Sequence, residues 1–174
     1  MDRPKEALLV IDMLNDFCRT GASLFVPMTK EVIPNIQREL SRAQAEGVPV
    51  VYVCDAHDPE DIEFGNWPPH AVAGSEGAQV IDELKPSGRD IVIHKKTLLG
   101  FHKTDLEKEL KGLGTNLVTV TGCVTNICVM LVAIEAAVRG FKVRVPRDCV
   151  AGLDKEMHEF ALRELREVIK AEII

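Results

Sequence analysis

The segment NLVTVTGCVTNICVMLVAIEAAVRGFKVRV (residues 116–145) decides the fold of this chain. It begins with a β-branched run at 116–121, continues with apolar residues at helical spacing between Ile127 and Val138, and ends with a second β-branched run at 141–145. Gly140 stands where the helix is expected to end. A strand, a helix and a second strand in this order predict two strands of a parallel sheet joined by a helix.

The same alternation extends over the rest of the chain. Further strands are predicted from apolar or β-branched runs at 7–11, 48–54, 90–94 and 171–174. Apolar residues at helical spacing predict further helices that include residues 33–43 and 157–168, and a capping box of Thr104 with Glu107 predicts a helix through Leu110. Strands alternating with helices predict an α/β fold: an open, mainly parallel six-stranded sheet in three α/β/α layers, Rossmann-like, as a single domain over 1–174.

The composition excludes several classes of protein. With 46% apolar and 28% charged residues, the chain is expected to be globular. The net charge of −6 without a basic run argues against nucleic acid or an anionic membrane as a partner. No apolar stretch approaches the roughly 20 residues of a membrane span, and the N-terminus is a poor signal peptide. Five cysteines without a repeating pattern suit a reducing environment, so we expect a cytoplasmic protein.

Chemically active side chains gather where the predicted strands end. Asp12 follows the first strand, Asp55 follows the second, Lys95 and Lys96 follow the third, and Cys128 lies shortly after the fourth. Each of these residues alone is more often a cap, a solvated lysine or a packed thiol than a functional group. Because ligands of parallel sheets bind at the carboxyl ends of the strands, their shared edge predicts a functional site.

The two cysteines of the segment 116–145 are expected to differ in reactivity. The C-x4-C spacing of Cys123 and Cys128 matches neither a short zinc motif nor a C-x-x-C redox motif. If Thr125 is the N-cap, Cys128 lies in the first helical turn, where free backbone N–H groups and the helix dipole favour the thiolate. Cys123 lies before the helix and receives less of this help.

A second pattern indicates a metal site. Asp55 and His57 are two residues apart at the end of an extended segment, so both side chains are expected on one face. His70 in WPPH (67–70) can approach as a third ligand, and this set suits zinc, iron or manganese. The alternative is that Asp55 and His57 cap a loop and His70 is a surface residue. The remaining histidines have no partner pattern and are expected to be structural or solvated: His94, His102 and His158.

Five segments together resemble the isochorismatase-like cysteine hydrolases and, within them, the nicotinamidases. They occur in the family's order and span nearly the whole chain: VIDMLNDF (10–17), CDAHDP (54–59), NWPPHAVAGSEGA (66–78), HKKTLLGFHKTDL (94–106) and TGCVTNICV (121–129). The last segment is similar to the family's G-x-x-T-x-x-C-V pattern around the nucleophile. The WPPH motif with D-x-H upstream is the more specific feature, because it resembles the members that carry a metal.

The resemblance implies a role for each matching residue. It makes Cys128 the nucleophile, Asp12 its acid/base partner and Lys95 the third member of a triad, with Lys96 as the alternative after a one-residue shift. Counting back from Phe101 without a gap selects Lys95.

The resemblance also implies a divalent metal ion, zinc before iron or manganese, held by Asp55, His57 and His70. A fourth ligand in the family is often a histidine six residues after the first, and here Glu63 occupies that position. Glu63 is expected to ligate through its carboxylate or through a water. The presence of Glu63 in place of this histidine leaves the coordination and the identity of the metal open.

Further implied features concern the substrate pocket. Phe17 and Trp67 match aromatic residues that sandwich a nicotinamide ring. Leu98 and Leu99 stand where a Tyr-Ser pair is common, so this wall is expected to differ. A cis peptide bond is expected between Cys123 and Val124, with backbone N–H groups at this turn holding an oxyanion.

The function that the resemblance implies is the hydrolysis of nicotinamide to nicotinate and ammonia through a cysteine thioester, a step of NAD salvage. One alternative is a related amidase for an N-carbamoyl, ureido or maleamate substrate, which would keep Asp12, Lys95 and Cys128 without the metal set. Another is a non-catalytic protein that retains the fold. A small-molecule amide is the expected partner, and a homo-oligomer is left open.

Overall fold

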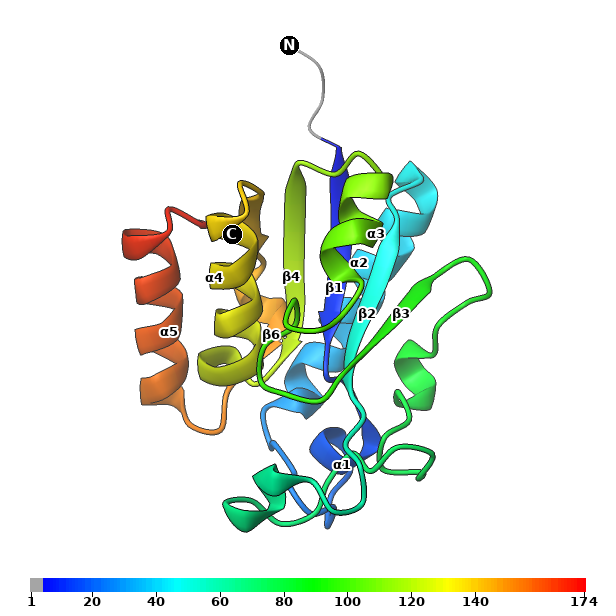
Figure 1. Cartoon of the computed structure of the whole chain (residues 1–174). Coiled ribbons are helices and arrows are strands. Elements are labelled where there is room, and N and C mark those ends of the chain that lie inside the picture. The colour runs from blue at the N-terminus through cyan, green and yellow to red at the C-terminus, as the bar shows by residue number, and fades with distance from the viewer. Residues whose placement is uncertain (1–4) are drawn as a thin grey trace.

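A twisted sheet forms the centre of the protein (Figure 1). The structure is a computed structural model and describes residues 5–174. Six strands follow the order β3-β2-β1-β4-β5-β7, and a two-residue strand, β6, pairs with β4 outside this line. All strand pairs are parallel. The strands are β1 (Glu6–Ile11), β2 (Val50–Asp55), β3 (Ile91–Lys95), β4 (Leu117–Cys123), β5 (Lys142–Val145), β6 (Val150–Ala151) and β7 (Glu172–Ile173).

The predicted α/β fold with six parallel strands is confirmed, with one addition. The six expected strands all form, and each lies within two residues of its predicted bounds. The seventh strand, β6, was not expected. It is too short to give a periodic signal, and it forms because Val150 and Ala151 pair with Gly122 and Cys123 of β4.

Helices cover both faces of the sheet (Figure 1). One apolar core lies between the sheet and the helix α2, and another lies between the opposite face and α3, α4 and α5. None of the helices among residues 5–174 is long and apolar enough to cross a membrane. The helices are α1 (Asn15–Cys18), α2 (Thr29–Glu46), α3 (Leu106–Gly112), α4 (Met130–Val138) and α5 (Lys155–Val168).

The central strands are buried on both faces, which explains their continuous apolar sequences. Residues 7–11 of β1 are fully buried, and all six residues of β2 are buried. A strand between two helical layers has no solvent-facing side, so it shows no polar alternation. The two neighbours β1 and β4 run side by side over six residue pairs, from Glu6 with Leu117 to Ile11 with Gly122.

The segment after β4 differs from the sequence expectation. Thr125 is not an N-cap. The residues Thr125–Val129 form a π-helical turn, η3, that leads into α4. The Thr125 hydroxyl lies 2.9 Å from Nδ1 of His158 in α5, and both side chains are buried. This bond ties η3 to α5, so His158 has a structural role, as expected. Its partner, Thr125, could not be identified from the sequence pattern.

Most of the irregular segment 56–90 lies at the carboxyl ends of the strands together with α1, and its last residues return to the amino end of β3 (Figure 1). It contains two short helical turns, η1 (Ile62–Gly65) and η2 (Asp82–Leu84). Isolated bridges pair His57 with Val72 and Leu14 with Val80. The segment is therefore ordered against the edge of the sheet where ligands of such folds bind.

Candidate active site

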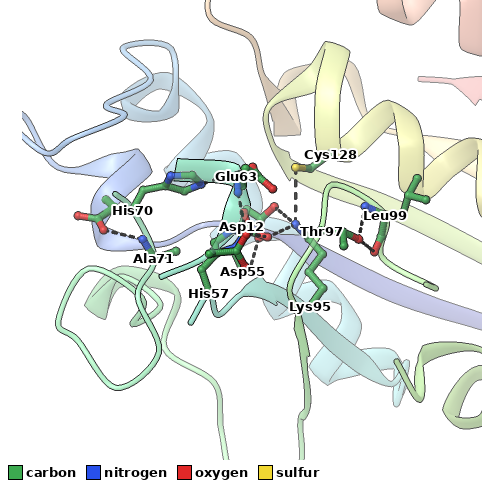
Figure 2. A network of polar contacts seen from close by, with 12 residues as sticks. Asp12, Asp55, His57, Glu63, His70, Ala71, Lys95, Thr97, Leu99 and Cys128 are labelled. Carbon is green, nitrogen blue, oxygen red and sulfur yellow. Dashed lines mark hydrogen bonds and ion pairs between the residues drawn. The ribbon is translucent and has the colours of Figure 1, made fainter. Parts of the chain in front are cut away.

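A cavity of about 390 Å³ opens at the carboxyl ends of the strands. The ends of β1, β2 and β3 bring Asp12, Asp55 and Lys95 to this edge, and η3 brings Cys128 from the end of β4 (Figure 2). Asp12, Asp55 and Cys128 line the cavity, and Lys95 lies behind them. Four of the five residues that the sequence placed at one edge are thus brought together in one buried cluster, whereas Lys96 is exposed and pairs with Asp58.

The ammonium group of Lys95 is the centre of this cluster. Nζ lies 2.9 Å from Oδ2 of Asp12, 2.5 Å from Oδ1 of Asp55 and 3.6 Å from Sγ of Cys128 (Figure 2). The side chain is only 1% exposed. Burial lowers the pKa of Lys95, but the neighbouring Asp12, Cys128 and Asp55 outweigh this and raise the pKa well above its ordinary value. Lys95 is therefore a permanently charged member of the cluster.

Asp12 is held in a backbone conformation that a non-glycine residue rarely adopts. Its φ is +49°, its backbone N–H donates to the Val53 carbonyl, and its Oδ1 accepts from the Asp55 backbone N–H at 2.8 Å. Burial and the Asp55 carboxylate raise the pKa of Asp12 to about 6, although Lys95 opposes the shift. A carboxylate with a pKa close to neutral can both accept and return a proton.

The thiol of Cys128 is buried against this carboxylate. Burial raises the pKa of Cys128 well above its ordinary value; Lys95 lowers it, and the charge of Asp12 raises it further. The expectation that helix geometry alone favours the thiolate is therefore wrong. The π-helical turn replaces the expected first turn of an α-helix. Burial next to a carboxylate raises the Cys128 pKa by more than the helix end lowers it. Cys128 needs a base, and the buried carboxylates of Asp12 and Asp55 both lie within 4.8 Å of Sγ. Asp12 is the better proton acceptor, because its pKa is raised whereas, despite burial, the charge of Lys95 holds the pKa of Asp55 below its ordinary value.

The turn before Cys128 forms part of the cavity wall. Cys123 and Val124 both line the cavity, and the peptide bond between them is cis. The thiol of Cys123 donates to the Asp12 carbonyl at 3.2 Å, so its own role is to fasten the turn to β1. All five cysteines are buried and free.

Three possible metal ligands lie beside the cluster around Lys95: Asp55, His57 and His70. One ligand atom from each lies within 4.8 Å of the others, and all three residues are buried. Nδ1 of His57 lies 3.1 Å from an Asp61 oxygen, and Nδ1 of His70 lies 2.8 Å from the Pro68 carbonyl. Both partners are acceptors, so Nδ1 of each ring donates to them, and Nε2 of a neutral ring is then the nitrogen that can bind a metal ion.

These residues fit a divalent metal ion. Nε2 of His57 is buried and has no hydrogen-bond partner among residues 5–174, which is the state expected of a ligand atom. It lies 3.7 Å from Oδ1 of Asp55, and Nε2 of His70 lies 3.8 Å from Oε1 of Glu63. Two imidazoles with one or two carboxylates form a donor set that suits zinc, iron or manganese.

A second group of possible ligands consists of Asp12, Asp55 and Cys128. The ammonium of Lys95 contacts all three and supplies the positive charge that a metal would bring. This group is therefore a charge-balanced ionic cluster, in which Lys95 takes the place that a metal ion would have. Asp55 links the two groups, because its carboxylate pairs with Lys95 and also faces His57.

Several supporting residues were missed in the sequence. Asp61 orients His57, and Asp16 accepts from the Ala71 backbone N–H at 2.8 Å beside His70. The Phe64 ring meets the rings of His57 and His70 with centroid distances of 5.5 and 5.6 Å. The i, i+4 spacing of His57 and Asp61 was a usable signal; the other contacts depend on how the irregular segment folds back.

The rest of the cavity lining is largely apolar. Phe17 and Trp67, the aromatic pair expected to hold a ring, both line the cavity, with Phe17 buried and Trp67 41% exposed. The charged residues among its lining are Asp12, Asp55 and Glu63, and no Lys or Arg of the described chain belongs to that lining. The other lining residues are Ala22, Ser23, Leu24, Phe25, Val26, His70, Leu98, Cys123, Val124, Ile127, Cys128 and Leu153.

A family model for the isochorismatase domain matches residues 6–173. The chain belongs to the isochorismatase domain family. Nicotinamidase 3 of Arabidopsis thaliana is 32% identical over 165 residues, which cover 91% of this chain and 79% of that protein.

Solved structures of this family share the fold and differ in their named activities. The pyrazinamidase of Pyrococcus horikoshii in complex with zinc is 32% identical, with a TM-score of 0.92 over 98% of this chain and 99% of that one. The N-carbamoylsarcosine amidase of Thermoplasma acidophilum is also 32% identical, with a TM-score of 0.88 over 97% and 95%. Membership of the family therefore leaves the substrate to be argued from the site.

Proposed function

We propose that the protein is a cysteine amidohydrolase that converts nicotinamide to nicotinate and ammonia. The observation that carries the proposal is the buried cluster in which Lys95 contacts both Asp12 and Cys128 at the floor of a cavity. A nucleophile, a proton acceptor and a cation of fixed charge at these distances are the groups that thiol-dependent acyl transfer needs.

The first half of the reaction follows from the proton positions. Asp12 accepts the thiol proton of Cys128 while Sγ attacks the amide carbonyl, and Lys95 stabilises the sulfur as its charge develops. Backbone N–H groups of the turn at Val124 and Cys128 hold the oxyanion; one such donor is typically worth about 3 kcal/mol of barrier height. Asp12 then protonates the departing ammonia, which leaves a thioester on Cys128.

The second half returns the free thiol. Asp12, now deprotonated, accepts a proton from a water molecule that attacks the thioester carbonyl. Nicotinate leaves, and the proton returns to Cys128. The pKa of Asp12 near 6 suits this exchange, since the group must accept and donate within one cycle.

The metal set favours a pyridine amide over other amides. Asp55, His57, His70 and Glu63 would hold the ion, and when bound it supplies a Lewis acid that can anchor a ring nitrogen. Phe17 and Trp67 line the same cavity and offer aromatic faces to the ring. The similarity to a zinc-containing pyrazinamidase supports this choice.

The alternative substrates are amides that carry a carboxylate, such as N-carbamoyl amino acids and maleamate. A carboxylate in a partly desolvated cavity requires a cationic partner. The lining formed by the described residues contains three acidic side chains and no Lys or Arg. An uncharged amide is therefore favoured, and a carboxylated one is expected to be hydrolysed far more slowly.

The test measures ammonia released from nicotinamide, N-carbamoylsarcosine and maleamate by the purified metal-loaded protein. We expect release from nicotinamide, and its loss in Cys128→Ala. The matched control Cys149→Ala removes another buried thiol, one that does not line the cavity, and should retain activity. Activity that survives Cys128→Ala contradicts the thioester mechanism, and preference for a carboxylated amide contradicts the choice of nicotinamide.

The metal proposal has its own measurement. His57→Ala should lower the bound metal, measured by elemental analysis, by at least about tenfold at limiting metal, since it removes a ligand whose second ring nitrogen is oriented by Asp61. His94→Ala, outside this set, should keep the metal content of the wild type. Equal metal content in both variants would contradict the assignment. Rapid labelling of Cys128 by iodoacetamide at neutral pH would count against a non-catalytic protein.

A further inference from the structure

The cavity changes character from its floor to its mouth. The floor holds the buried polar groups Asp12, Asp55 and Cys128. The lining residues Leu98 and Leu153 are 36% and 47% exposed, so they lie where the cavity meets solvent. Large apolar side chains at the mouth of a polar site cost solvation unless something covers them.

Both leucines flank the segment that carries Cys128. The loop after β3 crosses to α4, where the Phe101 backbone N–H donates to Glu135 at 3.0 Å, and this crossing brings Leu98 with it. Leu153 comes two residues after Ala151, which pairs with Cys123 directly before η3. Ile127 of η3 and Cys128 line the same cavity as the two leucines.

This apolar mouth, defined by Leu98, Ile127 and Leu153, is separate from the metal side of the cavity. Phe17 and His70 belong to the opposite side, where their rings lie 5.6 Å apart. A pyridine ring held there leaves the mouth free, and the cavity of about 390 Å³ falls in the size range of sites for larger ligands.

We propose that the apolar mouth is a binding subsite for an uncharged, apolar substituent of the amide substrate. The inference deepens the proposed function and depends on Cys128 as the reacting group. It names the substrate class as neutral carboxamides that carry an alkyl or aryl extension, for which unsubstituted nicotinamide is the smallest member. Each methylene buried against the leucines should increase the reactivity of a bound compound by about twofold to fourfold.

The test uses 2-iodoacetamide and its N-ethyl, N-butyl and N-hexyl derivatives. Each alkylates Cys128 by displacing iodide, and the rate constant at Cys128 is followed by peptide mass spectrometry and divided by the rate constant for glutathione. We expect the normalised rate constant to rise with chain length by about twofold to fourfold per methylene.

Two variants test whether the increase with chain length depends on the apolar mouth or on any exposed apolar side chain. In Leu98→Ser/Leu153→Ser, the increase with chain length should disappear when each rate constant is divided by that of the same variant for 2-iodoacetamide. Leu113→Ser is the matched control, because Leu113 is also 36% exposed but does not line this cavity. It should keep the full increase.

The outcomes separate the subsite from the proposed function. A normalised rate constant that is independent of chain length, or an increase that survives the double variant, overturns the subsite even if nicotinamide is hydrolysed. No reaction at Cys128 with any of the four compounds overturns the subsite and the proposed nucleophile together. A clear increase without ammonia release from nicotinamide supports the subsite and rejects nicotinamide as the substrate.

Discussion

Lys95 and Lys96 are neighbours in sequence, and their side chains lie in opposite surroundings. Lys95 is buried and contacts Asp12, Asp55 and Cys128, whereas the Lys96 side chain is 59% exposed and pairs with Asp58 at 2.7 Å. Because β3 places alternate residues on opposite faces, only one of the two can point into the cluster. The buried lysine balances the two buried carboxylates of Asp12 and Asp55.

Replacing Lys95 by Met should therefore cost both stability and activity. The change leaves the carboxylates of Asp12 and Asp55 buried without their cation, which is expected to lower the free energy of unfolding by about 3–5 kcal/mol. Urea unfolding at pH 7 measures the loss, and ammonia release measures the activity. Lys96→Met is the matched control and should change neither. A stable, active Lys95→Met protein would show that Asp12 needs no positive neighbour.

At the scale of elements, the contact between β1 and β4 determines where the cluster forms. Gly122 pairs with Ile11, directly before Asp12, and has a φ of +111°. A Cβ at this position would lie 2.0 Å from the Ile11 carbonyl oxygen. Only glycine allows the two strands to stay this close as the chain turns from β4 toward Cys128.

Gly122→Ala should destabilise the protein and reduce its activity together. The added methyl must push β4 away from β1 in a backbone conformation that alanine rarely adopts, so we expect a loss of at least about 2 kcal/mol in the free energy of unfolding. Gly112→Ala is the control, because a Cβ there meets nothing within 4 Å and the residue ends α3. It should stabilise by about 0.5 kcal/mol. Equal unfolding curves for the two variants would contradict this account.

The elements differ in how well the sequence predicts them, for a physical reason. Strands such as β1 and β2 are buried on both faces, so their apolar runs alone identify them. The π-helical turn η3 instead depends on the bond between Thr125 and His158, residues 33 apart in sequence. Within the site, the residues at strand ends could be predicted from alternation, whereas Phe64 meets His57 and His70 only because the irregular segment folds back.

At the scale of the whole molecule, the two ends of the sheet hold different kinds of polar cluster. The carboxyl ends carry the candidate active site, and the amino end of β1 carries Glu6. Glu6 accepts from Arg42 at 2.6 Å and from Thr119 at 2.7 Å, and it lies 3.9 Å from Arg144. This cluster ties α2 to β1, β4 and β5, so it stabilises the fold without contacting the cavity.

Glu6→Gln should therefore lower stability and leave turnover unchanged, since six residues of β1 separate the clusters by about 17–20 Å. Burial would raise the pKa of Glu6, but the bonds from Arg42 and Thr119 outweigh it and hold the pKa below its ordinary value of 4.5. A lowered pKa in the folded state contributes stability above pH 4.5 that is lost as the pH falls further. Urea unfolding at pH 7 should thus show a loss of about 1–3 kcal/mol in the variant, and the difference from wild type should shrink below pH 4.5. A difference that stays constant with pH would mean that the Glu6 charge contributes nothing, and a fall in ammonia release would mean that the two ends of the sheet are coupled.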